Sequence, residues 1–488
     1  MAFGGTVTGC AKTSSEGAVN TVGQSDSDEI SEILTGTEAA VPAPDLPQVD
    51  MGGKEFTILT QRWYDYAPLD MNDITIEEQT GEILNDAAFI RQSAVSEKYN
   101  CTIKCHEVIA TGGAGGVDEI TSSVMAGENA YDFAVIRSVK YNSLITSGYL
   151  TDLSDIPYLE LEREYYAQQS YSALAICGNH YGIVSNITMN PYLLIFCTYF
   201  NKTLFEDYNF DNPYDMVRDG SWTIDTVYDL GKIASSDLNG DGKHDAHDRY
   251  GISIVNDVYE GLINSSGVTV AVSNGDTFEK LYNSEAAITK IQHICDIFKD
   301  KEATFNIHSR ENELKDAGLD EVKLFKQRGS LFSMAGIYYA PQFRDMDDDF
   351  GILPMPKYDE EQEEYISPVF CDVFPITVVP VTNDNLEYTG IIMEELSYRG
   401  YTELLPVFYD TILTGKCVRD DDSVEILDMI FSGASYDIGM IFNFGGVRTQ
   451  IRNLCIQGSD SFASTFASID NKVDQNIEDL INAVNEIE

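Results

Sequence analysis

The sequence predicts an α/β fold in which parallel sheets are built from βαβ units. From residue 54 onward, short apolar segments with strand character alternate with longer segments of helical periodicity, and this alternation is typical of parallel sheets. The composition, 43% hydrophobic and 23% charged, is that of a globular protein and not of a disordered one. A chain of 488 residues is long enough for two or three domains.

The first strand and the first helix have the clearest patterns. Residues 55–60 form a short apolar run that predicts a buried strand. Residues 81–99 predict a helix whose apolar positions recur at helical spacing, and its expected buried face consists of Ile83, Ala87, Ile90 and Ala94. In chain order, the next expected elements are a strand from Thr102, a helix with Val117, Ile120 and Val124 on one face, a strand over 131–136 and a helix that ends near Gly148.

A glycine-rich loop at 112–116 opens the second of these helices, but its spacing does not fit the GxGxxG pattern of dinucleotide-binding proteins. We therefore interpret it as a flexible connection.

In the second half of the chain, expected strands and helices alternate again, but the lengths of these elements differ from those in the first half. Thr223 can cap a helix that begins after Trp222, with Val227, Leu230 and Ile233 on one face. Short apolar runs at 330–335 and 349–353 predict strands, and a closing helix is expected from Asn471 onward. The apolar face of that closing helix consists of Val473, Ile477, Leu480, Val484 and Ile487.

The charge balance excludes several classes of partner. Eighty acidic residues against 31 basic ones give a net charge of −49. Nucleic acids and anionic lipid surfaces need a basic face, so we expect neither as a partner. Nine cysteines are ordinary usage for this length, and Cys101 and Cys105, on one strand, would lie too far apart to bridge each other.

The first fifty residues predict an anchor and a spacer. Residues 7–10 read Val-Thr-Gly-Cys and resemble a bacterial lipobox, in which Cys10 would carry the lipid; the basic and apolar regions of a signal peptide do not precede it, so we expect a truncated start. Residues 11–50 have the polar, proline-containing composition of a flexible linker. The apolar run at 192–199 is too short to cross a bilayer, so we expect a soluble body on a lipid anchor.

Residues 237–248 have the spacing of a calcium-binding loop. Gly242 stands at the sixth position, where such a loop must turn sharply. The candidate ligands are hard oxygen donors that suit Ca²⁺: the side chains of Asp237, Asn239, Asp241, Asp245 and Asp248 and the backbone carbonyl of Lys243. The alternative is a solvated acidic turn. A strand-like run follows the loop, so we expect a structural calcium site and not a switching helix pair.

Aromatic residues, and not catalytic motifs, are the positive evidence for function. The metalloprotease, nucleophile-elbow and phosphate-loop patterns are absent from the sequence. Trp63 and Tyr64 follow the first expected strand, and Arg137 follows the strand over 131–136. Tyr338 and Tyr339 follow the strand over 330–335. Open α/β sheets bind ligands at such strand ends, and aromatic faces pack on sugar rings. The alternative for each aromatic is core packing.

Several segments, taken in order, resemble extracellular solute-binding proteins of ABC importers, the family that includes maltose- and oligosaccharide-binding proteins. The chain is most similar to the lipoprotein members found in Gram-positive bacteria. The segments that carry the resemblance are 81–87, 131–136, 148–153, 220–225, the loop from Asp237 through Tyr250-Gly-Ile, 350–357, 405–410 and 419–421.

The resemblance implies a two-lobed periplasmic-binding-protein-like fold of type II, with lobes joined by hinge strands. Residues 1–50 would be the lipobox remnant and linker. The first lobe would comprise 51–190 and 351–402, and the second lobe 191–350 and 403–488. A ligand in the interlobe cleft would be enclosed by hinge closure.

The same resemblance implies a function without covalent chemistry, so we expect no enzyme. A carbohydrate, and specifically an oligosaccharide, would bind in the cleft and be delivered to ABC permease subunits in the membrane. The protein would be a monomer, held by its lipid on the extracellular face of the cell membrane. Arg137 falls where the family often places sugar contacts, Tyr338 and Tyr339 where a stacking aromatic often lies, and Asp372 in the segment that returns to the first lobe.

Three other functions remain open from the sequence. A secreted carbohydrate-active enzyme could use two of the many carboxylates as an acid/base pair. A binding protein for a non-sugar solute, such as a peptide, would share the fold. A surface adhesion module could use the calcium loop.

Overall fold

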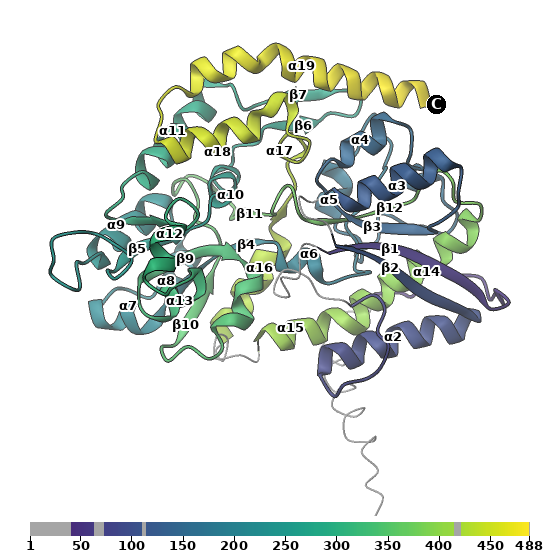
Figure 1. Ribbon diagram of the computed structural model, residues 1–488, viewed down its shortest axis with the longest axis horizontal. Coiled ribbons are helices and arrows are strands. Elements are labelled where there is room, and N and C mark those ends of the chain that lie inside the picture. Colours follow the sequence, from purple (N-terminus) through teal and green to yellow (C-terminus); the bar gives the residue numbers. More distant parts are fainter. Residues whose placement is uncertain (1–40, 63–72, 110–113, 414–420, 488) are drawn as a thin grey trace, which may run out of the picture. The chain divides into compact units, whose positions relative to one another are not determined.

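The computed structural model describes residues 41–62, 73–109, 114–413 and 421–487. Residues from Val41 onward belong to one compact unit (Figure 1), and its described residues form a four-stranded sheet, a five-stranded sheet and two small two-stranded sheets, one of them β6 (Ala271–Ser273) with β7 (Phe278–Lys280). We call the four-stranded sheet and its helices the first lobe, and the five-stranded sheet and its helices the second lobe.

The first lobe confirms the expected parallel sheet. Its strands stand in the order β12-β3-β1-β2; β1 is parallel to β2 and β3, and β12 is antiparallel to β3. The strands are β1 (Lys54–Arg62), β2 (Cys101–Ile109), β3 (Phe133–Arg137) and β12 (Pro375–Val378). The helices are α2 (Ile83–Tyr99), α3 (Gly115–Ala126), α4 (Tyr141–Thr146), α5 (Gln168–Ala173) and α14 (Leu386–Arg399).

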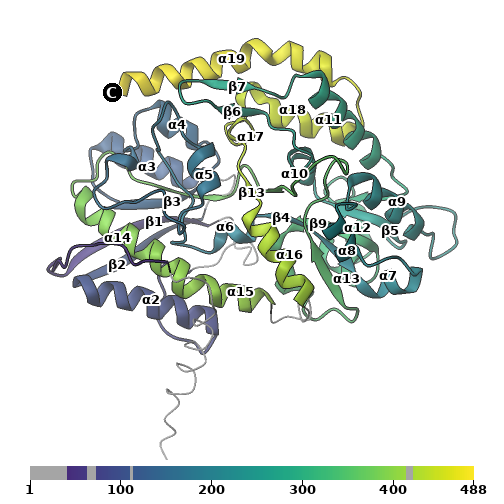
Figure 2. The same ribbon diagram turned by 180° about the vertical axis from the view of Figure 1, so that it is seen from behind.

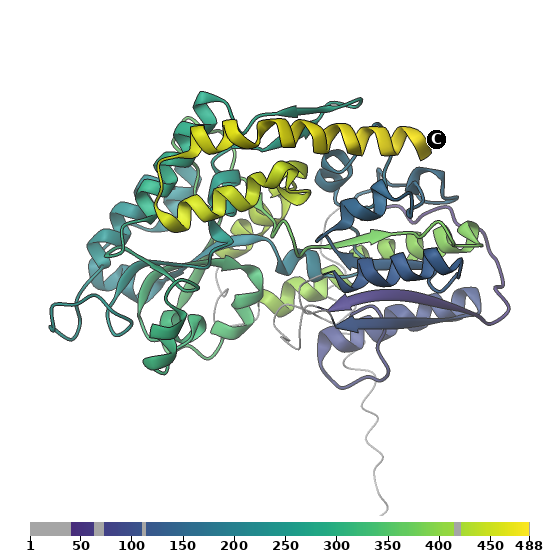
Figure 3. The same cartoon turned by 45° about the horizontal axis from the view of Figure 1, so that its top comes forward.

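Strands β1 and β3 are buried on both faces, which explains why they read as continuous apolar runs. Phe56 and Phe133 point to a core shared with α2 and α14, whereas Leu59 and Ile136 point to the core that contains α3. The helices therefore cover both faces of the sheet (Figure 3).

The buried face of α2 differs from the expected one. Ile83 and Ile90 are 56% and 46% exposed, and the buried residues are Leu84, Ala87, Ala88, Arg91, Val95 and Tyr99. The apolar pattern failed because a charged residue, Arg91, belongs to the buried face.

The second lobe contains a mixed sheet in the order β10-β4-β9-β5-β8. Strand β5 is parallel to β8 and β9, and β4 is antiparallel to β9 and β10. The strands are β4 (Phe196–Asn201), β5 (Tyr250–Ile254), β8 (Thr304–Asn306), β9 (Ser330–Gly336) and β10 (Phe350–Leu353). The helices around it include α7 (Lys202–Tyr208), α8 (Pro213–Asp219), α9 (Ile224–Ala234), α10 (Val258–Ser265), α11 (Glu285–Phe298), α12 (Glu311–Asp316), α13 (Glu321–Lys326) and α18 (Val447–Gln457).

Helix α9 begins where the sequence predicts. The Thr223 hydroxyl caps it by accepting the backbone N–H of Thr226 at 3.3 Å, and the fully buried Trp222 donates its indole N–H to the carbonyl of Pro354 at 3.0 Å. The expected apolar face is wrong at Ile233, which is 62% exposed. Gly231 lies against the sheet in its place, where a Cβ on Gly251 would stand 2.3 Å from the Gly231 Cα.

The described chain passes between the lobes at three places. The first crossing runs from Ile183, bridged to Thr377 of the first lobe, through α6 (Asn190–Leu193) into β4. The second runs from β10 through β11 (Ser367–Pro368) to β12. In the third, a π-helical turn over Gly400–Leu404 joins α14 to α15 (Leu405–Leu413), and α16 (Asp421–Ser432) then leads to β13 (Ala434–Ser435), which pairs with β11.

One expected lobe boundary needs correction. The family resemblance implies a return to the first lobe at residue 351, but β10 pairs with β4 in the second sheet. The return therefore takes place after β10, between β11 and β12. The expected linker also ends before residue 50, because Val41, Leu46 and Val49 pack against the core of the first lobe. The remaining boundaries stay predictions.

The C-terminal helix α19 (Phe462–Ile487) begins earlier than expected and extends from the second lobe to the first (Figures 1 and 2). Val473, Ile477, Leu480 and Val484 form its buried face as predicted. Ile487 is 42% exposed and lies beside Gly148, next to α4. The connection from β13 to α18 includes the short helix α17 (Ile438–Ile441), which Asp437 caps.

Two buried charged residues, Arg91 and Asp73, join α2 to two of the crossings. Arg91 donates to the backbone carbonyls of Ile187 at 2.9 Å and of Asp73, and the Asp73 carboxylate accepts the N–H of Met189 at 2.5 Å. Gly400 of the third crossing packs so closely that a Cβ would stand 1.7 Å from the carbonyl oxygen of Asn186. Burial raises the pKa of Asp73 and lowers that of Arg91, while each charge favours the ionised form of the other.

We expect Arg91→Ala to lower the free energy of unfolding by about 3–5 kcal/mol, because it leaves the Asp73 carboxylate buried without its counter-charge. Urea denaturation followed by circular dichroism measures the change. Arg163→Ala is the control, since Arg163 pairs with Glu160 at the surface and such pairs contribute about 0–1 kcal/mol. Equal losses in the two variants would contradict the role of Arg91.

Candidate functional site

The carboxyl ends of β1, β2 and β3 meet at one edge of the first sheet, where open parallel sheets bind ligands. A hollow of about 30 Å³ lies at this edge, between the ends of these strands and residues Thr188, Asn190 and Pro375 of the crossings. This volume equals the space of about one water molecule. The hollow as it stands does not hold a sugar ring, so a sugar would need the lobes to move.

Arg137 lies at this edge, as the sequence predicts. Its side chain is 2% exposed, and its guanidinium donates to the carbonyl of Val373 at 2.6 Å. Burial lowers the pKa of Arg137 to about 9. The side chain thus connects the end of β3 to the second crossing, and its contact with a sugar stays a prediction.

Three polar residues at the same edge were not found by sequence reasoning. The Gln61 side-chain carbonyl accepts the N–H of Gly116 at 3.0 Å, and Arg62 pairs with Glu107 at 3.3 Å. A Cβ on Gly116 would stand 2.5 Å from Ile136 and 2.7 Å from Gln61. The end of the glycine-rich stretch, which we interpreted as a flexible connection, therefore packs against β1 and β3, and the close approach needs glycine.

Trp63 and Tyr64 follow β1 directly in the sequence. Both lie outside the described residues, so their proposed role as aromatic ligand contacts stays a prediction.

Tyr338 and Tyr339 lie in the 3-10 helix η3 (Ile337–Phe343), immediately after β9. They are 6% and 2% exposed, and their ring centroids are 4.5 Å apart. Tyr338 packs on Phe370, and Tyr339 on Phe343. Both rings thus belong to the aromatic core beside the second crossing in this structure, and their contact with a ligand stays a prediction.

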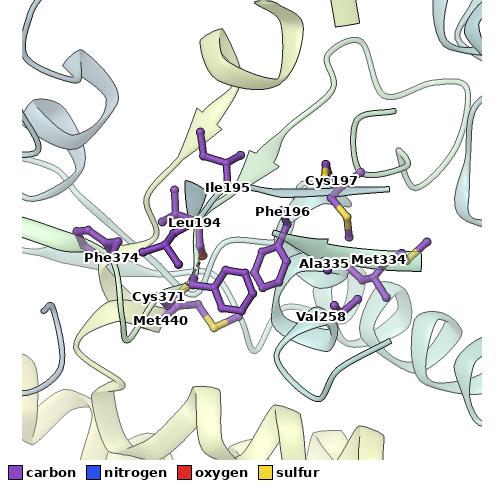
Figure 4. Close-up of a cluster of buried hydrophobic side chains, with 14 of the residues drawn as sticks. Leu194, Ile195, Phe196, Cys197, Val258, Met334, Ala335, Cys371, Phe374 and Met440 are labelled. Carbon is purple, nitrogen blue, oxygen red and sulfur yellow. Dashed lines mark hydrogen bonds between the residues drawn. The ribbon is translucent and has the colours of Figure 1, made fainter. Parts of the chain in front are cut away.

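Residues from several distant parts of the chain form the core beside the second crossing (Figure 4). Phe196 of β4 stacks on Phe370 of the crossing with ring centroids 3.9 Å apart, and Phe374 packs edge-on against Tyr436 at 5.4 Å. Cys371 and Met440 point into the same apolar cluster (Figure 4). The crossing is therefore held by packing on both of its sides.

Asp372 belongs to a group of five charged residues that we call the crossing charge cluster: Asp257, Glu260, Asp372, Arg448 and Arg452. Arg448 forms an ion pair with Asp372 at 3.2 Å. Arg452 donates to Glu260 and Asp257, each at 2.7 Å. The structure thus pairs Asp372 with two arginines of α18, which also contact Asp257 and Glu260.

Glu260 is the most deeply buried carboxylate of this cluster, at 4% exposed. Burial raises its pKa to about 8, although Arg452 and Arg448 favour the ionised form and oppose this shift.

The calcium-type loop folds around its own carboxylates. Asp237 accepts the N–H groups of Gly240 and Gly242 at 2.6 and 2.9 Å, and these bonds lower its pKa. Asp248, 1% exposed, accepts the N–H groups of Leu238 and Asp245, both at 2.9 Å. Strand β5 follows the loop, as predicted.

The donor chemistry of this loop suits calcium, but its carboxylates serve the loop backbone. In the part of the chain that the structure describes, no group of three or more His, Cys, Asp or Glu side chains is arranged to hold a metal ion. The calcium assignment, with the ligands Asp237, Asn239, Asp241, Lys243, Asp245 and Asp248, therefore stays a prediction.

We predict that Glu260 makes the protein less stable as pH rises. A carboxyl whose pKa is raised from 4.5 to about 8 on folding gives its full contribution to stability below pH 4.5, and this contribution is lost as pH rises to about 8. Urea denaturation at several pH values should show a flatter pH dependence for Glu260→Gln between about pH 5 and 8. Identical slopes for the variant and the parent would contradict this.

We also predict that Tyr339→Ala lowers the free energy of unfolding by about 3–5 kcal/mol, because it opens a cavity in the aromatic core. Tyr339→Phe keeps the ring and should be close to the parent. A thermal or urea unfolding curve for Tyr339→Ala that matches the parent would show that the ring is not part of the core in solution.

Comparison with known proteins identifies the fold. No protein-family model matches the chain, and no curated protein matches it by sequence. Among solved structures, an ABC substrate-binding protein from Listeria monocytogenes in complex with cycloalternan superposes with a TM-score of 0.55 at 12% identity, over 88% of this chain and 99% of that one.

Two further sugar-bound proteins superpose on the chain with similar TM-scores and similar sequence identities. The galacto-N-biose-/lacto-N-biose I-binding protein of the ABC transporter from Bifidobacterium longum has a TM-score of 0.55 at 15% identity, over 88% of this chain and 98% of its own. The maltose-binding protein MalE from Listeria monocytogenes, in complex with maltose, has a TM-score of 0.53 at 15% identity, over 89% and 98%. The chain therefore has the two-lobed α/β fold of ABC-transporter substrate-binding proteins.

Proposed function

We propose that the protein is an extracellular solute-binding protein that captures an oligosaccharide between its lobes and delivers it to the permease of an ABC importer. The observation that carries the proposal is the fold, which superposes on sugar-bound proteins of this class. The polar edge of the first sheet, with Gln61, Arg62, Glu107 and Arg137, supplies hydrogen-bonding groups where such sheets bind ligands.

The charges at the strand ends favour binding over catalysis. Glu107 is paired with Arg62, and Asp372 with Arg448. A carboxylate that is paired with an arginine can still accept hydrogen bonds from hydroxyl groups, as a sugar-binding site requires. We therefore propose that this site recognises hydroxyls and performs no reaction.

Thermal-shift and calorimetric screening against maltose, maltotriose, lacto-N-biose and cycloalternan tests the proposal, and we expect at least one of these sugars or a related oligosaccharide to stabilise the protein. A shift with peptides and with none of the sugars would contradict it and favour a peptide ligand. Turnover of a chromogenic glycoside would instead favour a carbohydrate-active enzyme.

The aromatic contacts can be tested on the same sugar. We expect Trp63→Ala and Tyr64→Ala to weaken binding by about tenfold or more, corresponding to ~1.4 kcal/mol, because each removes a face on which a sugar ring packs. Tyr158→Ala is the control, since Tyr158 is 39% exposed on the first lobe. Unchanged affinity for the sugar in both variants would show that neither residue contributes to the binding site.

We propose further that Cys10 carries a lipid and that residues 11–40 serve as the spacer to the body, which begins at Val41 and would work as a monomer. The polar composition of the spacer supports this, and among the described residues no helix has the length and apolarity needed to span a membrane. Cys10→Ser in a Gram-positive host should release the protein from the membrane fraction. Equal retention of variant and parent would contradict lipid attachment.

We propose that the loop at 237–248 binds calcium as a structural ion. The oxygen donors at calcium spacing and the positive φ of 74° at Gly242 support this. Added calcium should raise the thermal midpoint of the parent and leave Asp241→Asn unaffected. A parent whose midpoint is the same with calcium and with a chelator would contradict the assignment.

A further inference from the structure

Both lobes hold the second crossing within the short stretch from Cys371 to Phe374. The first lobe holds its backbone: the Ser138 hydroxyl donates to the carbonyl of Cys371 at 3.0 Å, and the Ser138 N–H donates to the carbonyl of Phe374, also at 3.0 Å. Arg137 donates to the carbonyl of Val373 between them. The side chain of Asp372, within this stretch, is instead paired with Arg448 and Arg452 of the second lobe.

We propose that the ion pair between Asp372 and Arg448 is a pivot contact that fixes how the two lobes are oriented, and that it thereby prepares the ligand site. Asp372 is a positioning residue in this proposal, since it acts through the crossing. The effect on ligand affinity rests on the proposed function, whereas the effect on the crossing does not.

Because Arg448 is buried, loss of the Asp372 charge would be costly. The Arg448 side chain is 11% exposed, and its Nη1 atom is buried without a hydrogen-bond partner. Its other carboxylate contact, with Glu260, is longer, at 3.9 Å. Without the Asp372 charge, Arg448 would keep only that weaker contact, and a buried charge that loses its partner is strongly destabilised. The crossing would then lose its polar attachment to α18.

The rest of the cluster stays within the second lobe. Asp257 and Glu260 belong to or adjoin α10, and Arg452 belongs to α18, so the contacts among these three residues join two helices of one lobe. Only Asp372, among the five, comes from the crossing. Asp257→Asn therefore removes a neighbouring carboxylate from the same cluster without touching the pivot contact, which makes it a matched control for Asp372→Asn.

A looser crossing should weaken ligand binding. If the free protein samples more lobe orientations, only a fraction of molecules present the site correctly, and the apparent dissociation constant rises by the inverse of that fraction. Ordering the crossing on binding adds an entropic cost.

Hydrogen exchange of the ligand-free protein tests the pivot directly. We expect Asp372→Asn to speed amide exchange in the peptide covering 369–375 by about tenfold, with Arg448→Gln giving a similar change and the double variant little more than either alone. Asp372→Glu should restore most of the protection, and Asp257→Asn should leave this peptide unchanged. Small-angle scattering of Asp372→Asn should show a wider distribution of dimensions than the parent.

Parent-like exchange in Asp372→Asn, or the same acceleration in Asp257→Asn, would overturn the proposal. Binding of the sugar found by screening should be about fivefold or more weaker in Asp372→Asn than in Asp257→Asn; equal affinity would overturn the link to the ligand site. If no sugar binds the parent while exchange still accelerates in Asp372→Asn alone, the proposed function fails and the pivot contact is supported.

Discussion

Within the described residues, three chain segments pass from one lobe to the other, and their backbone polar groups are removed from water where they do so. A buried carbonyl or N–H must find a partner, because leaving it without one costs about 1–3 kcal/mol. Arg91 and Asp73 supply partners for the first crossing, and Ser138 and Arg137 do so for the second. The sheets, the strand-end site and any motion of the lobes all depend on these partners, since they determine where one lobe stands relative to the other.

Electrostatics in this acidic chain act at two scales. The net charge of −49 is largely carried by solvated carboxylates and excludes polyanionic partners. Arginine is scarce by comparison, and several arginines are placed inside the molecule at the crossings: Arg91, Arg137 and Arg448. A guanidinium can donate to several carbonyls or carboxylates at once, which suits a position where segments from distant parts of the sequence meet.

Local patterns in the sequence predicted local structure well. The strands β1, β2, β3, β5 and β9, the Thr223 cap and the buried face of α19 all follow from periodicity and capping over a few residues. The predicted buried face of α2 was wrong because Arg91 belongs to that face. Its charge is balanced by Asp73, and the apolar periodicity of a helix cannot reveal such a partner.

The same limit applies to the site. Arg137 was found because strand ends can be read from the sequence, whereas the crossing charge cluster joins residues 257–260, 372 and 448–452. Such groupings arise only when the whole chain folds. Tyr338 and Tyr339 show the converse, since their position after β9 was predicted correctly but their burial depends on Phe343 and Phe370.

The central claim is that an oligosaccharide binds between the two lobes at the carboxyl edge of the first sheet. A crystal structure of the protein with the tightest-binding sugar tests this most directly. The account predicts sugar density in contact with the strand-end residues around Arg62 and Arg137, with the lobes moved relative to the arrangement described above. Sugar bound elsewhere on the surface, with this edge empty, would contradict it.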